Sequence, residues 1–135
     1  MKTLDAVMTK YDVEIPAHLE ADAEIAIISG KPQRQGDVMV RRMTPGLIAG
    51  LEAVPAAGIP VVRGESGHTH TLVAEGNVTY APSPTEGLIQ GSLEVKEGGQ
   101  AFLIHPEHGA MGIGVGQYTI RRQREQADEI RAVED

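Results

Sequence analysis

The chain has 135 residues, a formal net charge of −7, no cysteine, no tryptophan, one phenylalanine and three tyrosines. Without cysteine it forms no disulfide, thiolate zinc site or iron–sulfur cluster, and imidazole and carboxylate groups are the strong metal ligands that remain. Acidic residues outnumber basic ones by 19 to 12. We therefore expect no nucleic-acid partner, because neutralising phosphates requires a surplus of positive charge on one face.

The length allows one domain with a modest core, and the scarcity of aromatic residues restricts that core to aliphatic side chains. Such a core is compatible with a homo-oligomer, in which assembly buries further area. The N-terminal stretch lacks the apolar run of a secretory signal, and no segment reaches the roughly 18 apolar residues of a membrane span. The sequence therefore predicts a cytoplasmic protein without a membrane partner.

A short helix is predicted near the start of the chain. The apolar residues Leu4, Val7, Met8 and Tyr11 recur at the spacing that places side chains on one stripe of a helix. We expect this helix to end before Pro16, because proline interrupts helical hydrogen bonding.

A second short helix is predicted over residues 44–54, with Thr44 as its N-cap and Pro45 at its first position. Taken together, the patterns divide the chain into an N-terminal helix with its lead-in at 1–22, a β-domain at 23–126, and a C-terminal turn or tail at 127–135.

The β-domain is predicted from short apolar runs that glycine and proline interrupt. The runs AEIAIIS and DVMVRRM come first, and turn signals then recur every 8 to 12 residues, which favours an antiparallel barrel or sandwich over βαβ units. The glycines of Gly112-Ile-Gly114-Val-Gly116 are expected to form a flexible loop. The predicted strands beyond Gly58 are 59–63, 68–75, 77–81, 88–95, 100–105 and 117–124. The predicted fold is a single, mainly-β domain, a small cupin- or jelly-roll-like barrel or sandwich, with a short N-terminal helix packed on it.

Four of the five histidines fall in two clusters on these strands. His68 and His70 are one residue apart on a predicted strand, so their side chains point to the same face. His105 ends another strand, and Pro106 directs His108 into the loop beyond it. His18 stands alone and is expected at the surface.

Three interpretations of these histidines remain open. If the two strands are neighbours, the four imidazoles, or three of them with Glu75 or Glu107, suit a divalent metal ion such as Zn, Fe, Mn, Ni or Cu. Alternatively, the histidines are structural and fix a turn through hydrogen bonds. In the third interpretation they form a metal-free acid–base site or bind a small-molecule ligand.

The string His68-Thr-His70-Thr-Leu-Val-Ala-Glu75-Gly76 resembles the first cupin motif, in which two histidines and a glutamate bind a divalent metal inside a small β-barrel. This resemblance implies ligand roles for His68, His70 and Glu75. The fourth cupin ligand is a histidine from a later strand, for which His105 is the nearest match and His108 the alternative.

A longer stretch resembles an uncharacterised group of small bacterial and phage-borne proteins. The matching residues are HPEHGAMGIGVGQYTIRRQREQADEIRAVED, with HTHTLVAEG upstream. This resemblance implies no known activity.

The leading hypothesis is a cupin-like protein that binds a divalent metal through His68, His70 and His105, with Glu75, Glu107 or His108 completing or supporting the site. If the protein is an enzyme, the metal acts as a Lewis acid or activates water or dioxygen. The rival hypothesis is a non-catalytic structural or interaction module, of phage origin and self-associating.

Overall fold

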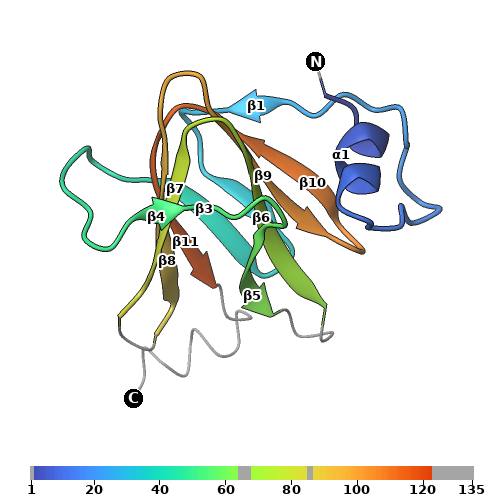
Figure 1. Ribbon diagram of the computed structural model, residues 1–135. Coiled ribbons are helices and arrows are strands. Elements are labelled where there is room, and N and C mark those ends of the chain that lie inside the picture. The colour runs from blue at the N-terminus through green and yellow to red at the C-terminus, as the bar shows by residue number, and fades with distance from the viewer. Residues whose placement is uncertain (1, 64–67, 85–86, 123–135) are drawn as a thin grey trace.

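Eleven strands and one short helix form a two-layered β-sandwich in the computed structural model, which describes residues 2–63, 68–84 and 87–122 (Figure 1). The predicted mainly-β sandwich with an N-terminal helix is confirmed, and the two sheets do not close into a barrel over the described residues. The elements are α1 (Leu4–Lys10), β1 (Ile27–Ile28), β2 (Gln33–Gln35), β3 (Val38–Arg42), β4 (Glu52–Ala53), β5 (Ile59–Arg63), β6 (Thr69–Glu75), β7 (Val78–Pro82), β8 (Ile89–Val95), β9 (Gln100–His105), β10 (Gly109–Ile113) and β11 (Gly116–Arg122).

One sheet has the strand order β1-β10-β9-β6-β5 and the other the order β2-β3-β11-β8-β7-β4. Neighbouring strands pair in the antiparallel sense, except that β1 and β10 are parallel. Each of the six strands predicted beyond Gly58 is present, with its described ends displaced by one residue at most, and positions 123 and 124 of the last predicted strand lie outside the described residues. The predicted C-terminal turn or tail at 127–135 lies outside the described residues.

The alternation of side chains along β6 and β9 divides the apolar residues between two cores. Leu72 pairs with Leu103 and both face the space between the sheets, whereas Val73 and Phe102 face outward. The inner core consists of aliphatic residues and two tyrosines: Val38, Val40, Val62, Leu72, Val78, Tyr80, Leu93, Val95, Ala101, Leu103, Ile113, Tyr118 and Ile120. The outer core lies on the other face of the first sheet, where α1 covers it.

The helix α1 forms where the apolar spacing predicts it and packs on the outer face of the first sheet. The side chain of Thr3 caps its N-terminus by accepting a hydrogen bond from the amide of Ala6 at 3.2 Å. Its buried stripe of Leu4, Val7 and Met8 packs in one cluster with the outward side chains of β6 and β9. This packing ties the N-terminal segment to the strands that carry the histidines.

The prediction of a helix over residues 44–54 is wrong. This segment is the loop between β3 and β4, followed by the two residues of β4, which pair with β7. Gly50 has a φ of 78°, in the left-handed region that an α-helix excludes. The side chain of Gln117 also hydrogen-bonds both the amide and the carbonyl of Gly46, which fixes the loop instead of a helical turn.

The glycines expected to form a flexible loop instead belong largely to strand pairing. Gly112 lies in β10 opposite Ile27 of β1, and a Cβ atom on Gly112 would lie 2.6 Å from the carbonyl oxygen of Ala26. The missing side chain therefore allows the two strands to approach closely. An apolar strand this rich in glycine gives the same local signal as a loop.

Candidate histidine site

The two histidine clusters meet at one end of the sandwich. β6 and β9 pair with Thr71 opposite Ile104, so the next pair along the ladder is His70 and His105. Both side chains alternate with inward-facing leucines and are almost fully buried, at 1% and 2% exposure. Their ring centroids are 4.3 Å apart, as expected for directly opposite residues on one face.

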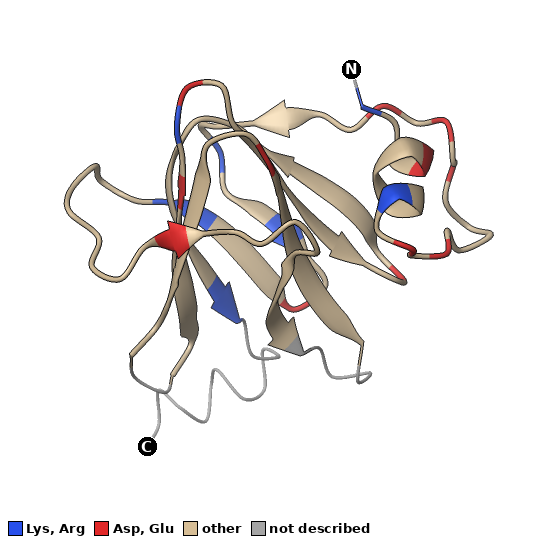
Figure 2. Cartoon of the chain, viewed as in Figure 1, with Lys and Arg blue, Asp and Glu red and all other residues tan. Residues whose placement is uncertain are grey.

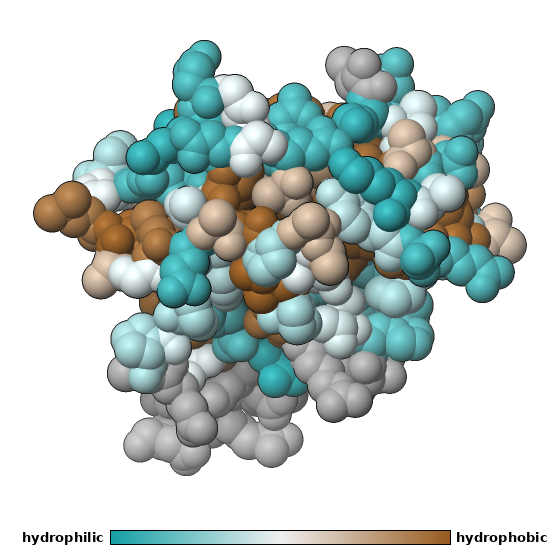
Figure 3. All heavy atoms as spheres, in the orientation of Figure 1, coloured by the Kyte–Doolittle hydropathy of each residue, from teal (hydrophilic) through white to brown (hydrophobic). Residues whose placement is uncertain are grey.

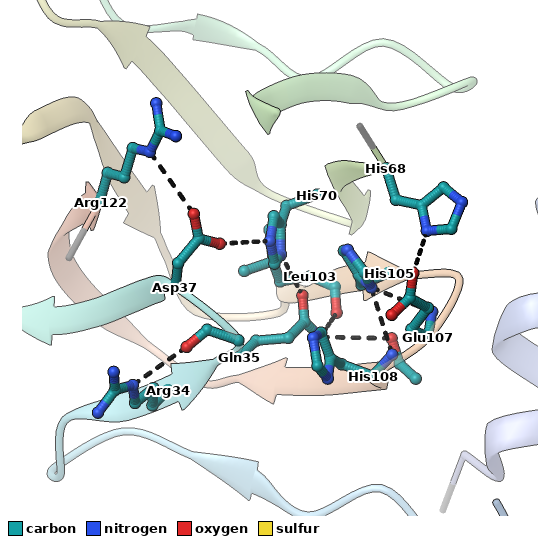
Figure 4. A network of polar contacts seen from close by, with 12 residues as sticks. Arg34, Gln35, Asp37, His68, His70, Leu103, His105, Glu107, His108 and Arg122 are labelled. Atoms are coloured by element: carbon teal, nitrogen blue, oxygen red, sulfur yellow. Dashed lines mark hydrogen bonds and ion pairs between the residues drawn. The ribbon is translucent and has the colours of Figure 1, made fainter. Parts of the chain in front are cut away.

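The other two histidines extend this pair toward solvent (Figure 4). The His108 ring lies 4.6 Å from the His105 ring, and the His68 ring lies 5.9 Å from it. Nδ1 of His68 lies 2.5 Å from Oε1 of Glu107, and both side chains are about half-exposed. The structure therefore brings His68, His70, His105 and His108 together.

Gln35, at the end of β2, fixes the tautomer of His70. Its Nε2 donates hydrogen bonds to the carbonyl oxygens of Leu103 at 2.8 Å and Gly109 at 3.3 Å. The amide oxygen of Gln35 therefore faces His70 Nδ1 at 2.9 Å and must accept its proton. With the proton on Nδ1, the neutral ring has a bare Nε2.

This bare nitrogen faces a carboxylate. Nε2 of His70 lies 3.2 Å from Oδ1 of Asp37, and two lone pairs at this distance require a proton or a cation between them. Burial lowers the pKa of His70, with the charge of Asp37 acting in the opposite sense. Protonation of Nε2 therefore costs desolvation free energy.

Asp37 has further capacity to bind a positive group. Its Oδ2 is buried and accepts no hydrogen bond among the described residues. Nε of Arg122 lies 3.5 Å from this oxygen, which is close enough for attraction between charges but too long for a good hydrogen bond. Oδ2 therefore retains lone pairs on the side of the carboxylate that faces Arg122, while Oδ1 faces His70 (Figure 4).

His105 has a different role, because its Nδ1 is occupied by the turn between β9 and β10. This nitrogen accepts hydrogen bonds from the amides of Glu107 at 3.0 Å and His108 at 3.3 Å. Burial, followed by the charges of His70 and His108, lowers the pKa of His105 to about 4. The ring is therefore neutral near pH 7, with its proton on Nε2, and its contacts are those of a structural histidine.

Gly36 makes room for the His108 ring over the turn between β2 and β3. Its φ is 59°, in the left-handed region, and a Cβ atom there would lie 2.8 Å from Nε2 of His108 and 3.6 Å from Cε1 of His70. Among the described residues the imidazole of His108 has no hydrogen-bond partner. His108 is exposed, and its ring is therefore less constrained than those of the buried His70 and His105.

Glu75 lies outside the histidine cluster. It is five residues after His70 on the same strand, an odd spacing that directs its side chain to the opposite face of the sheet. There it pairs with the ammonium groups of Lys2 at 2.9 Å and Lys10 at 3.5 Å, and the hydrogen bond from Lys2 lowers the pKa of Glu75. Glu75 thus anchors the helical segment to the sheet.

His18 is exposed, as expected, and its Nε2 lies 3.0 Å from the carbonyl oxygen of Glu107. Gln35 and Asp37 are the site residues that sequence reasoning did not find. They flank a glycine in a β-turn, where polar residues are ordinary. The available signal was their position directly before the apolar strand VMVRR.

The side chains as they stand do not form a finished metal site. Within residues 2–63, 68–84 and 87–122, no three His, Asp or Glu side chains are arranged to hold a metal ion. His70 Nε2 and Asp37 Oδ1 supply two donors, and a third requires one neighbouring side chain to turn.

An open groove of about 680 Å³ runs beside the cluster, between the segment that follows α1 and the strands β2 and β10. Gln35, Gly36 and His108 form one end of its wall, and Ile25, Ile28 and Met111 contribute apolar surface. The His108 ring therefore borders both the buried histidine pair and a space that is large enough for a small molecule.

A β-sandwich with a histidine-rich end is the class that these features define. The family model described as Domain of unknown function (DUF8820) matches residues 34–123, and the chain belongs to this family. The matched region includes Gln35, Asp37 and the four clustered histidines. No curated protein and no solved structure matches the chain. No helix in the described part of the chain is long and apolar enough to cross a membrane.

Proposed function

We propose that this protein binds a divalent metal ion at the histidine end of the sandwich, through Nε2 of His70 and Oδ1 of Asp37. The observation that carries the proposal is the separation of 3.2 Å between these two atoms. Two ligand bonds of about 2.0–2.1 Å that meet at a tetrahedral angle place their donor atoms roughly 3.4 Å apart.

Gln35 supports this assignment because it holds the proton on His70 Nδ1, at 2.9 Å. Metal-binding histidines generally donate their second ring N–H to an acceptor of this kind, which fixes the ring and its tautomer. A divalent cation between the bare Nε2 and the carboxylate would also supply the positive charge that attracts both groups.

The third ligand in this proposal is His108, after rotation of its side chain toward His70. Its ring has no hydrogen bond to lose among the described residues, whereas His105 would lose the two amide contacts that hold its turn. The ligand set therefore contains Asp37 where the cupin resemblance implied Glu75. Two imidazoles and one carboxylate suit Zn, Fe, Mn or Ni.

A metal held by three side chains keeps at least one position for water or a substrate atom. The groove beside His108 would deliver a small-molecule ligand to that position. We accordingly propose a cytoplasmic metal-binding protein, with Lewis-acid or water-activating chemistry as its reaction class if it is an enzyme.

Metal binding in solution tests the proposal directly. Protein prepared without a histidine tag is titrated with Zn(II), Mn(II) and Ni(II) by calorimetry, and the variants Asp37→Asn and His70→Gln are compared with the wild type. We expect one ion per chain, with affinity reduced at least tenfold in both variants. The control His18→Gln alters an exposed histidine outside the cluster and should leave binding unchanged. Absence of binding by the wild type, or equal binding by all four proteins, contradicts the proposal.

The alternative of a non-catalytic structural module is supported by His105, which caps a turn, and by the buried hydrogen bonds of Gln35. In that case His70 and Asp37 share a proton instead of a metal. The wild type would then bind no metal, and both Asp37→Asn and His70→Gln would lower the melting temperature of the protein in chelator.

A further inference from the structure

A long exposed segment of this acidic protein is almost free of charge. Between positions 43 and 62 only Glu52 is ionisable as an acid or base, although 23% of the whole chain is charged. Leu47 is fully exposed at the tip of the loop between β3 and β4. In Figure 2 this loop is uncoloured up to the red of β4, and in Figure 3 hydrophobic residues gather over it and toward the middle of the view.

The loop is held in place and presents Leu47 to solvent. The side-chain amide of Gln117 donates to the carbonyl of Gly46 at 2.8 Å and accepts from the amide of Gly46 at 2.7 Å. Gln117 is itself fixed by a hydrogen bond to Glu94 at 2.5 Å. An exposed leucine on a fixed loop loses little conformational entropy when a partner covers it.

An apolar pocket of about 360 Å³ lies on the same flank, between the edge strands β4 and β5. Its wall is mainly apolar, with Glu52 and Gln90 as its polar members: Glu52, Ala53, Pro55, Ile59, Pro60, Val61, Tyr80, Pro82 and Gln90. The loop that carries Leu47 leads directly into β4, so the protruding leucine and the pocket belong to one continuous surface.

We propose that this surface, formed by the exposed side chains of residues 43–61, is a homodimer interface in which Leu47 of each copy enters the apolar pocket of the other. A two-fold axis makes a surface self-complementary when it carries both a protrusion and a matching hollow. Charge also favours a second copy as the partner. The exposed Arg41 and Arg42 precede the loop and Glu52 lines the pocket, so each copy would bring positive charge toward the negative charge of the other copy's pocket. Two copies that each carry a net charge of −7 are expected to meet through a face poor in charge.

Sedimentation over a range of protein concentrations tests the interface, with the variant Leu47→Ser and the matched control Val115→Ser. Val115 is also an exposed apolar residue, at 43%, but it lies outside residues 43–61. We expect the wild type and Val115→Ser to dimerise equally. Removing one leucine that the dimer buries should weaken association about tenfold, and Leu47→Ser, which removes both copies of Leu47, should weaken it about a hundredfold. Because Leu47 makes no buried contact within the chain, the melting temperature of monomeric Leu47→Ser should match that of the monomeric wild type.

Ala53→Arg, which fills the pocket from the other side of the contact, should also yield a monomer. A wild type that remains monomeric at every concentration overturns the proposal, whether or not it associates with lipid vesicles or another protein. A Leu47→Ser dimer with unchanged affinity overturns it as well.

The absence of cysteine from the chain permits a test of the geometry. A mixture of Leu47→Cys and Pro55→Cys chains should form a disulfide-linked heterodimer under mild oxidation. A mixture of Val115→Cys and Pro55→Cys chains should not. Equal cross-linking in the two mixtures would contradict the placement of Leu47 in the pocket of the partner.

Discussion

Gln35 connects more of the candidate site than any histidine does. Its amide donates to the carbonyls of Leu103 and Gly109 and accepts from His70, so one side chain from the second sheet satisfies three polar groups of the first. Its own exposure is only 4%. Polar groups buried to this degree are costly when they lose their partners, which makes Gln35 a structural requirement for the tautomer of His70.

Replacing Gln35 with leucine should therefore destabilise the protein. The buried N–H of His70 and the carbonyl of Leu103 lose their partner, and we expect the free energy of unfolding to fall by about 1–3 kcal/mol. Urea denaturation measures this change, with the exposed neighbour Arg34→Leu as its control. A loss as small as that of the control would show that the hydrogen bonds of Gln35 contribute little.

The lowered pKa of His105, about 4 against 6.5 for an unperturbed histidine, makes stability depend on pH. The native ring resists protonation, so the unfolded chain binds more protons between these two values. The contribution of His105 to stability is complete above pH 6.5 and is lost as the pH falls toward 4. The lowered pKa of the buried His70 acts in the same direction.

Urea denaturation of the metal-free protein at pH 7.5 and at pH 5 checks this dependence. The variant His105→Asn provides the comparison, because an asparagine oxygen can accept the turn amides but does not titrate in this range. We expect a smaller loss of stability on acidification in His105→Asn than in the wild type. Equal losses would assign the pH dependence to other groups.

At the scale of elements, the sequence predicts the helix and strands that have a clear apolar periodicity. It does not predict the segments whose structure depends on long-range packing. The apolar stripe of α1 and the alternation in β6 and β9 were sufficient to place those elements and the inward face of His70. β10 was missed because Gly112 and its neighbours replace side chains with close backbone approach. The sequence predicts a helix where the loop before β4 lies, because the contact between Gln117 and Gly46 joins residues 71 positions apart and leaves no local signal.

The docking of α1 gives a prediction of its own. Met8 is fully buried, at 0% exposure, in the outer core beneath the helix. Met8→Ala leaves a cavity there and should lower the free energy of unfolding by about 2–5 kcal/mol. Thr9→Ala, one position along on the exposed side, should cost far less. Similar melting temperatures for these two variants would mean that the helix is not docked as described.

At the scale of the whole molecule, the sequence predicted that two histidine clusters exist but could not determine their partners. Which strands are neighbours follows from the sheet order, and this order alone brought His70 beside His105. Asp37 and Gln35 come from the opposite sheet, and no local pattern signals that contact. Glu75 satisfies the spacing of the cupin motif, yet the parity of the strand places it on the other face.

The contacts that Gln35 makes across the two sheets have a consequence for the order of folding. They join residues separated by 35 to 74 positions in the chain, so loop closure delays them until β9 and β10 have been formed and both sheets have met. Interactions formed this late are largely absent from the transition state and chiefly govern how slowly the native state opens. We therefore expect the contacts at the histidine end to form late in folding and to slow the separation of the two sheets in the native protein.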